Sequence, residues 1–163
     1  MYKRIRKGLD TFLEVLTAVV MGILVLDVTW QVITRFILKN PSNWSEELAT
    51  YLMIWVGLLG AAVALNRGAH LGIDYFVGKL DQKKRLITEL IVFLSIGFFS
   101  VFVLILGGVK LVQETFQMGQ TAPATGIKIG YVYISVPVSG FFIALYSFEF
   151  FVESFLKLKK LSS

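Results

Sequence analysis

Three groups of polar residues in this chain have the types and spacing that site chemistry requires. Asp27, Gln31 and Arg35 follow one another at steps of four inside a long apolar block, so helical spacing puts them on one face. An acid near a bilayer centre costs about 2.5–3.5 kcal/mol on insertion scales, and such a group is expected to face protein or water. Two interpretations are open: an ion or proton site, or a contact that docks this helix on a partner. Gln31 and Arg35 favour the second, since they can satisfy the acid.

The second group is a pair of adjacent acids, Glu46 and Glu47, which precede another apolar block in the stretch NWSEEL. Asn43 and Glu46 have the spacing of a capping box, and acids in a first turn favourably meet the positive end of the helix dipole. Adjacent acids point to different sides of a helix, which argues against a shared proton. Trp44 has the place of an interfacial aromatic residue. We interpret the stretch as an anchored start of a helix, not as a catalytic pair.

The third group is Arg67, His70 and Asp74, whose spacing allows contacts across one or two helical turns. His70 is the only histidine and there is no cysteine, so the usual ligands of zinc or haem are missing. We expect a local hydrogen-bonded anchor here. The sequence also has no phosphate-binding glycine loop, no nucleophile elbow and no zinc-protease motif. We therefore expect no enzyme, and no catalytic, metal-binding or cofactor-binding residues in this chain.

Long apolar blocks must position these groups. The 163 residues are 56% hydrophobic and 17% charged, with a mean hydropathy of +0.73, whereas soluble domains carry roughly 25% charged residues. The apolar residues gather into four blocks, 12–38, 48–65, 86–112 and 131–156, each near the roughly 20 residues that cross a bilayer. The sequence therefore predicts an all-α integral membrane protein with four transmembrane helices in a single domain.

The basic residues indicate how the helices are oriented. Most lie within residues 3–7, 67–85 and 157–160, which four spans place on the same side of the membrane. The positive-inside rule puts that side, with both termini, in the cytoplasm. The net charge of +5 thus reports topology and contact with membrane lipids, and no nucleic-acid partner is expected. Four apolar residues at helical spacing also predict a short interfacial amphipathic helix between the second and third spans. They are Ile73, Phe76, Val77 and Leu80.

Small residues recur at the spacing that lets membrane helices approach closely. They are Gly57, Gly60, Ala61 and Ala64 in the second block and Gly140 and Ala144 in the fourth. For the second block, packing within the subunit and contact between subunits are both open. Glu149 lies on a face that runs toward the cytoplasmic boundary, where its side chain is expected to reach water. A bundle rich in packing features and poor in deep polar groups favours an accessory or scaffold subunit over a transporter that works alone.

The stretch from Trp44 to Asp74 resembles the signature of the small membrane subunit of tripartite ATP-independent periplasmic (TRAP) transporters, the DctQ-like or Q-type subunit. In that signature an aromatic residue and paired acids precede an apolar span with Gly-Ala, followed by Arg, His and Asp. The matching positions are Trp44, Glu46, Glu47, Gly60, Ala61, Arg67, His70 and Asp74. The later stretch IKIGYVYISVPVSG resembles the family's aromatic-x-x-x-Pro-x-Gly pattern, although the chain has Ile129-Gly130-Tyr131 where the family often has Pro-Trp.

The resemblance implies a subunit of the bacterial inner membrane that packs against a large multispan subunit as part of a fixed scaffold. In this family the large subunit holds the substrate and sodium sites, and a periplasmic binding protein delivers the substrate. The resemblance therefore implies no substrate-binding residues in this chain. The imported compounds are organic acids, including dicarboxylates, keto acids and sialic acids, taken up by symport. The alternative from another class is a self-contained small four-helix transporter that is proton-coupled through Asp27. Uptake by this chain alone would distinguish the two.

Overall fold

The computed structural model describes residues 2–68 and 81–162, and regular structure in these ranges is helical apart from one β-bridge between Thr121 and Lys128. Four helical stretches in these ranges are long and apolar enough to cross a membrane, namely Arg6–Ile37, Asn43–Asn66, Gln82–Gln117 and Ile129–Leu161. The predicted all-α membrane fold with four spans is thereby confirmed. Each helix is longer than its apolar block, because polar residues at the ends continue the helix. The predicted interfacial helix falls outside the described residues.

Two of the four spans contain a change in helical winding and a third contains a break, and the apolar pattern predicts none of these. The first span is α1 (Tyr2–Val32) followed by the π-helix η1 (Ile33–Ile37), and the second is α2 (Asn43–Asn66). The third consists of α4 (Gln82–Phe99), the π-helix η2 (Ser100–Gly107) and α5 (Gly108–Gln117). The fourth is α6 (Ile129–Tyr133) and α7 (Ser135–Ser162), with a break at Ile134.

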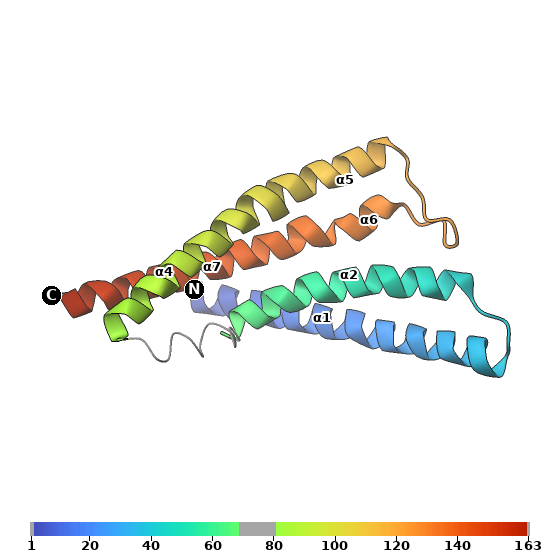
Figure 1. Cartoon of the computed structure of the whole chain (residues 1–163), viewed down its shortest axis with the longest axis horizontal. Helices are drawn as coiled ribbons and strands as arrows, with labels where there is room; N and C mark the ends of the chain where they lie inside the picture. Colours follow the sequence, from blue (N-terminus) through green and yellow to red (C-terminus); the bar gives the residue numbers. More distant parts are fainter. Residues whose placement is uncertain (1, 69–80, 163) are drawn as a thin grey trace.

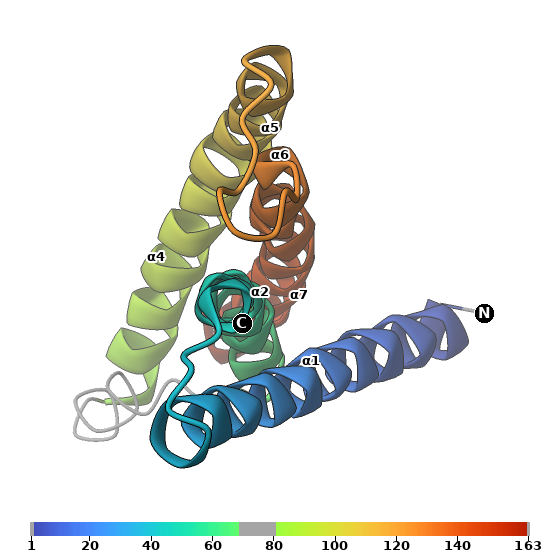
Figure 2. The same ribbon diagram turned by 90° about the vertical axis from the view of Figure 1, so that its right-hand side faces the viewer.

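The helices form two antiparallel pairs, α1 with α2 and α4–η2–α5 with α6–α7 (Figure 1). Across the molecule α2 packs on both α1 and α7, and α7 packs on α4 and η2. The chain termini and the start of α4 lie toward one end of the molecule, which we call the terminal end. The α1–α2 and α5–α6 connections lie at the opposite end, which we call the loop end. The two pairs diverge toward the loop end, and α1 leans away from α4 (Figure 2).

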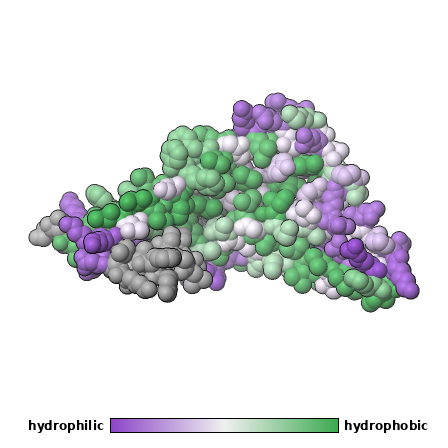
Figure 3. Space-filling model, viewed as in Figure 1, coloured by the Kyte–Doolittle hydropathy of each residue, from purple (hydrophilic) through white to green (hydrophobic). Residues whose placement is uncertain are grey.

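The buried core is small and is shared by α1, α2 and α7. It consists of Leu13, Leu59, Ala62, Leu65, Phe142 and Tyr146. Much apolar surface points outward instead, and Leu26 and Phe148 are 72% and 69% exposed. A hydrophobic middle with hydrophilic residues mostly toward the two ends is visible in Figure 3. Exposed apolar surface on this scale marks contact with membrane or protein, as expected for helices that face lipid.

Glycines allow the third and fourth spans to approach each other closely. These are Gly108, Gly130 and Gly140. A methyl group added at Gly140 would lie only 2.7 Å from the Cβ of Leu104 in η2. At the same contact, Ser100 Oγ donates a hydrogen bond of 2.6 Å to the carbonyl oxygen of Gly140. Close backbone approach with an interhelical hydrogen bond is a common way to hold membrane helices together.

Candidate functional site

Asp27 is buried in the first span without a partner among the described residues. It is 7% exposed, and neither carboxylate oxygen has a hydrogen-bond partner. The buried residues of this span, Leu13, Asp27 and Thr34, are separated by multiples of seven, which is close to two turns and keeps them on one face. Because α1 packs on α2, Asp27 lies in that contact and not toward lipid. This placement agrees with the expectation that an acid inside a membrane faces protein.

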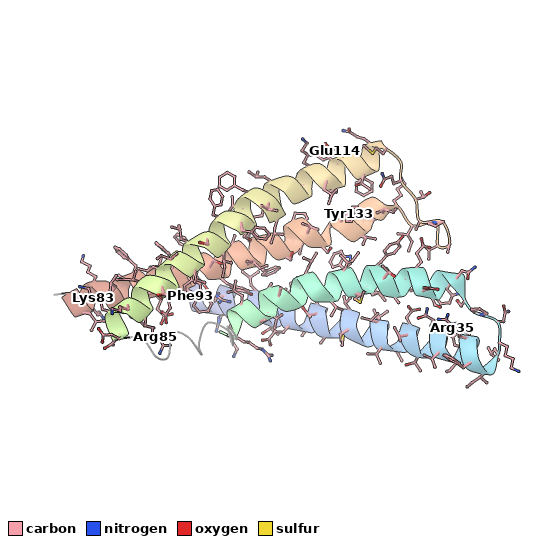
Figure 4. The ribbon with its side chains drawn as sticks, in the orientation of Figure 1. Arg35, Lys83, Arg85, Phe93, Glu114 and Tyr133 are labelled. Atoms are coloured by element: carbon pink, nitrogen blue, oxygen red, sulfur yellow. The ribbon has the colours of Figure 1, made fainter. Side chains whose placement is uncertain are left out.

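Gln31 and Arg35 do not supply the local donors that their spacing suggests, since both oxygens of Asp27 are unpaired. For Arg35 the reason lies in η1, where Leu38 N–H donates to the carbonyl of Ile33 (3.1 Å), five residues back. A π-helix has more residues per turn than an α-helix, so Arg35 is rotated off the predicted face. Arg35 is exposed near the loop end (Figure 4), whereas Gln31 is half-buried.

Glu47 connects the two helix pairs at the loop end. Its Oε2 accepts hydrogen bonds from the backbone N–H groups of Ala124 (2.9 Å) and Thr125 (2.7 Å) in the α5–α6 connection. Its Oε1 accepts a hydrogen bond of 2.9 Å from the Tyr51 hydroxyl, one turn along α2. The Tyr51 contact holds the Glu47 carboxylate in place, and the carboxylate in turn holds a connection that lies more than 70 residues away in the chain.

Glu46 and Trp44 differ from Glu47 because both are exposed. The capping box predicted from Asn43 and Glu46 is wrong. The helix already begins at Asn43, its N-cap is Ser42, and no side chain caps it by hydrogen bonding. The helix begins one residue earlier than a capping box with Asn43 at the N-cap requires, so Asn43 lies inside the first turn. The exposed indole of Trp44 stays compatible with an interfacial place.

Arg67 pairs with an acid on the neighbouring helix. Its Nη2 lies 3.1 Å from Oε1 of Glu14 on α1, and Nε donates to the same oxygen at 3.2 Å. The other two residues of the predicted anchor, His70 and Asp74, fall outside the described residues. The described part of the anchor thus joins α1 to the residue that follows α2, a contact that sequence spacing alone did not indicate.

A polar cluster toward the terminal end was missed by the sequence interpretation, which used Arg6 only as a topology signal. Arg6 Nε donates to Glu149 Oε2 on α7 (2.6 Å), Nη2 donates to Asn66 Oδ1 at the end of α2 (2.7 Å), and Nη1 pairs with Asp10. The guanidinium lies 4.3 Å from the ring centroid of Tyr146, whose hydroxyl donates to Asp10 at 3.0 Å. Glu149 was expected to reach water, yet this cluster holds it.

We call this group the Arg6 cluster, and it joins α1, α2 and α7 in one contact. Its charged side chains are only 17–27% exposed, so a guanidinium here needs acidic partners to offset its lost hydration. A planar guanidinium with five donors suits contacts to several helices at once. A signal for it existed in the sequence: an arginine beside the first span and an acid within the last one, each of which needs a partner.

The small residues of the second span have no close packing within the described residues. A methyl group added at Gly57 or Gly60 would meet no atom within 4 Å, and Ala61 and Ala64 are exposed. Gly140, by contrast, lies against η2, and Ala144 is half-buried. Of the two alternatives for the second span, contact between subunits is the one that these open positions favour.

The described residues contain no group of three or more His, Cys, Asp or Glu side chains able to hold a metal ion. Some of their polar side chains link helices to one another or to a connection, and others donate to the backbone of their own helix. Comparison with known families matches residues 24–157 to the DctQ component of tripartite ATP-independent periplasmic transporters. The chain belongs to this family. It is a small permease subunit of the TRAP type and a multi-pass membrane protein.

Individual relatives agree with this assignment. The chain is 34% identical over 151 residues to the sialic acid TRAP transporter small permease protein SiaQ of Vibrio cholerae, covering 90% of this chain and 83% of the relative. It is 28% identical to the C4-dicarboxylate TRAP transporter small permease protein DctQ of Rhodobacter capsulatus, covering 69% and 48%. It is also 30% identical to the sialic acid TRAP transporter permease protein SiaT of Haemophilus influenzae, covering 66% and 17%. These relatives are transporter permease subunits and not enzymes.

Proposed function

We propose that this chain is the small scaffold subunit of a sodium-coupled TRAP transporter that imports organic acids. In this proposal it packs against a large multispan subunit, which holds the substrate and sodium sites, and works with a periplasmic substrate-binding protein. The observation that carries the proposal is the family match over residues 24–157. Its support from the structure is that the Arg6 cluster and Glu47 hold helices and a connection of this chain together.

Sialic acid is the first substrate to test. The relative with 34% identity and coverage of most of both chains is named for sialic acid, whereas a second relative with 28% identity is named for C4-dicarboxylates. Both are organic acids. Selectivity is assigned to the partner proteins, because the described part of this chain has no cluster of deep polar groups that would bind a carboxylate.

Association with a large permease is supported by the Haemophilus protein SiaT. The matching segment forms only 17% of that permease, so a sequence of this type occurs there within one longer membrane protein. A small subunit encoded separately would occupy the corresponding place by non-covalent packing. Exposed apolar helix faces are available for that packing over much of the first, third and fourth spans.

The geometry suits a scaffold because the two helix pairs are connected near both ends. The Arg6 cluster joins α1 and α2 to α7 toward the terminal end, and Glu47 joins α2 to the α5–α6 connection at the loop end. Separating the pairs would break the charge-assisted hydrogen bonds of Arg6 and Glu47 together. A unit held in this way gives a moving transport domain a fixed surface.

The proposed location is the bacterial inner membrane, with both termini in the cytoplasm. Lys83 and Arg85 lie toward the terminal end (Figure 4), as do Arg4 and Lys7 at the start of α1 (Figure 1). Positive charge concentrated at one end of a bundle marks the cytoplasmic side. The loop end, with Glu47 and the α5–α6 connection, then faces the periplasm and is available to the binding protein.

Reconstitution tests the proposal directly. Liposomes that contain this chain, the large subunit encoded beside it and the binding protein should take up sialic acid in a sodium-dependent manner. Liposomes with this chain alone should take up none. Omission of this chain should abolish uptake or prevent recovery of the large subunit. Full sodium-driven uptake without this chain would overturn the scaffold role.

A second candidate is favoured by one observation, the unpaired carboxylate of Asp27. A self-contained transporter that is proton-coupled through this residue would move its substrate without a large subunit. The same liposomes with this chain alone distinguish it: uptake driven by a pH gradient, and lost in the Asp27→Asn variant, would establish this second function. The scaffold proposal expects no uptake by liposomes that contain this chain alone, either with Asp27 or with the Asp27→Asn substitution.

A further inference from the structure

The first turns of α4 and the last turns of α7 meet toward the terminal end. Ser154 Oγ on α7 donates a hydrogen bond of 3.1 Å to Glu89 Oε2 on α4, and the rings of Phe93 and Phe150 stack with their centroids 5.3 Å apart. The two contacts are separated by the same number of residues on each helix, in opposite chain directions, so they belong to one antiparallel register. The start of α4 and the C-terminus accordingly lie at the same end of the molecule (Figure 1).

This register brings four exposed lysines together, which we call the lysine patch. They are Lys83, Lys84, Lys159 and Lys160. Continued from the contact between Ser154 and Glu89 toward the terminal end, the register sets Lys84 level with Lys159. It likewise sets Lys83, which is labelled in Figure 4, level with Lys160. Two segments more than 70 residues apart in the chain therefore concentrate positive charge at one place.

The acids of this region do not neutralise the lysine patch. Glu89 pairs with Arg85 at 3.0 Å, and Glu153 pairs with Lys157 at 2.7 Å. No lysine of the patch has an ion-pair partner among the described residues. Asp81, just before α4, adds one negative charge, which leaves the positive charges in excess. Because like charges repel one another, an anion from outside the chain would stabilise this end.

The dipole of α4 adds to this imbalance. Lys83 and Lys84 stand in its first turn, which contains no acid. The first turn is the positive end of a helix, where cations are unfavourable, whereas Lys159 in the last turn of α7 is at a favourable negative end. The positive-inside rule accounts for basic residues on this side of the membrane, but it does not require them at the unfavourable end of a helix. An anion bound near Lys83 and Lys84 would offset both the repulsion and the dipole.

The depth of the lysine patch restricts the class of this anion. The third span begins at Gln82 and the fourth ends at Leu161, so the patch lies at the membrane boundary, where lipid headgroups are found. Apolar side chains next to it, toward the middle of the bundle, are exposed: Ile87 by 41% and Phe155 by 52%. A phospholipid with a negative headgroup complements both surfaces, whereas a soluble anion complements the lysines alone.

We propose that the lysine patch binds the headgroup of an anionic phospholipid, with the phosphate among the lysine side chains and the acyl chains against Ile87 and Phe155. Clusters of basic residues beside a membrane span are typical of such sites. The inference goes beyond the proposed function, because it concerns contact between this chain and the membrane. It holds for the chain with or without a large subunit.

Acetylation of lysines tests the site in the unmodified chain. The full chain is placed in nanodiscs of phosphatidylcholine, with or without phosphatidylglycerol, and treated briefly with an N-hydroxysuccinimide ester of acetate. Mass spectrometry measures the acetylation rate of each lysine. Phosphatidylglycerol should slow acetylation of the lysine patch several-fold, and should change Lys39 and Lys128 at the loop end by less than about twofold. Equal slowing at both ends, or no slowing at the patch, would overturn the proposal.

Two charge-matched variants provide an independent test. Lys84→Gln with Lys159→Gln removes two charges from the lysine patch, and Lys39→Gln with Lys128→Gln removes two from exposed positions at the loop end. Native mass spectrometry of the chain in non-ionic detergent measures binding of phosphatidylglycerol and of phosphatidylcholine with the same acyl chains. The first variant should lose at least about fivefold in affinity for phosphatidylglycerol, and the second should stay within about twofold. Lys84→Arg with Lys159→Arg, which keeps the charge, should also retain binding.

Three results would contradict a lipid site. They are equal affinity of the two glutamine variants, equal binding of both lipids by the unmodified chain, and displacement of phosphatidylglycerol by an equal concentration of inorganic phosphate. The last would mean that the patch binds a free anion and not a lipid. Gel filtration of each variant controls for folding. If the variant with Lys84→Gln and Lys159→Gln does not fold, the acetylation rates of the unmodified chain decide.

Discussion

Asp10 and Asp27 lie on the same helix and are both largely removed from water, yet their surroundings are opposite. Asp10 pairs with Arg6 and accepts the hydroxyl of Tyr146 at 3.0 Å. Asp27 has no donor among the described residues. Because hydrogen bonds to charged groups contribute about 1.5–3 kcal/mol, while an unpaired acid in a membrane is unfavourable, the same substitution at the two positions should have opposite effects.

We predict that Asp27→Asn stabilises the isolated chain by about 1–2 kcal/mol, because it removes an unpaired acid, a residue type whose insertion costs about 2.5–3.5 kcal/mol. Asp10→Asn should destabilise it by about 1.5–3 kcal/mol through the loss of charged contacts. Thermal unfolding in detergent, followed by helical signal or gel filtration, measures both. A loss of stability in Asp27→Asn would mean that the carboxylate has a partner and would contradict this assignment.

Glu46 and Glu47 form a second natural pair, adjacent in sequence but different in contacts. We predict that Glu47→Ala speeds hydrogen exchange of the Ala124 and Thr125 amides, because these N–H groups donate to its Oε2 at 2.9 and 2.7 Å. Glu46→Ala should leave both amides unchanged, since Glu46 is exposed and its carboxylate does not hold this connection. Mass spectrometry of the peptide covering residues 119–128 measures the exchange rate in each variant. Equal rates in the two variants would contradict the proposed role of Glu47 in holding this connection.

Between helices, packing depends on which glycines face a neighbour. Gly140 faces η2, where an added methyl group would lie 2.7 Å from Leu104 Cβ, whereas Gly57 faces open space. We predict that Gly140→Ala destabilises the isolated chain by about 1–3 kcal/mol through overpacking. Gly57→Ala should be neutral or stabilising by up to about 1 kcal/mol, because alanine favours the helix. Thermal unfolding measures the difference, and destabilisation by both would mean that Gly57 also packs within the chain.

The helices themselves follow from the sequence because an apolar run near bilayer length specifies a spanning helix with little help from its neighbours. The contacts between helices do not. The partners of Arg6 depend on how α1, α2 and α7 are aligned, and Glu47 binds a connection whose position no local pattern fixes. The local winding of η1 likewise overturned the face expected for Arg35. Periodicity assumes one helical repeat, and a π-helical turn breaks that assumption.

For the molecule as a whole, orientation follows from where the charges lie. The absence of cysteine makes single-cysteine variants clean reporters. We predict that a membrane-impermeant maleimide added to intact spheroplasts labels Lys39→Cys and Pro123→Cys at the loop end. Lys84→Cys and Lys159→Cys, toward the terminal end, should react only after lysis, because the positive-inside rule places them in the cytoplasm. The reverse pattern would invert the topology and separate the α5–α6 connection from a periplasmic partner.

A scaffold must also keep its shape while its partner moves. In this chain, separation of the two helix pairs would break the Arg6–Glu149 contact of 2.6 Å and the Glu47–Thr125 contact of 2.7 Å together. We therefore predict that spin labels on Val19→Cys in α1 and Ile91→Cys in α4, both exposed positions, keep one distance distribution in the complete complex when sodium and substrate are added. Pulsed electron paramagnetic resonance measures this, with a label pair across the transport domain of the large subunit as the control that should shift. A change of several ångströms in this chain would mean that its helix pairs take part in the transport motion, and the fixed-scaffold role would have to be abandoned.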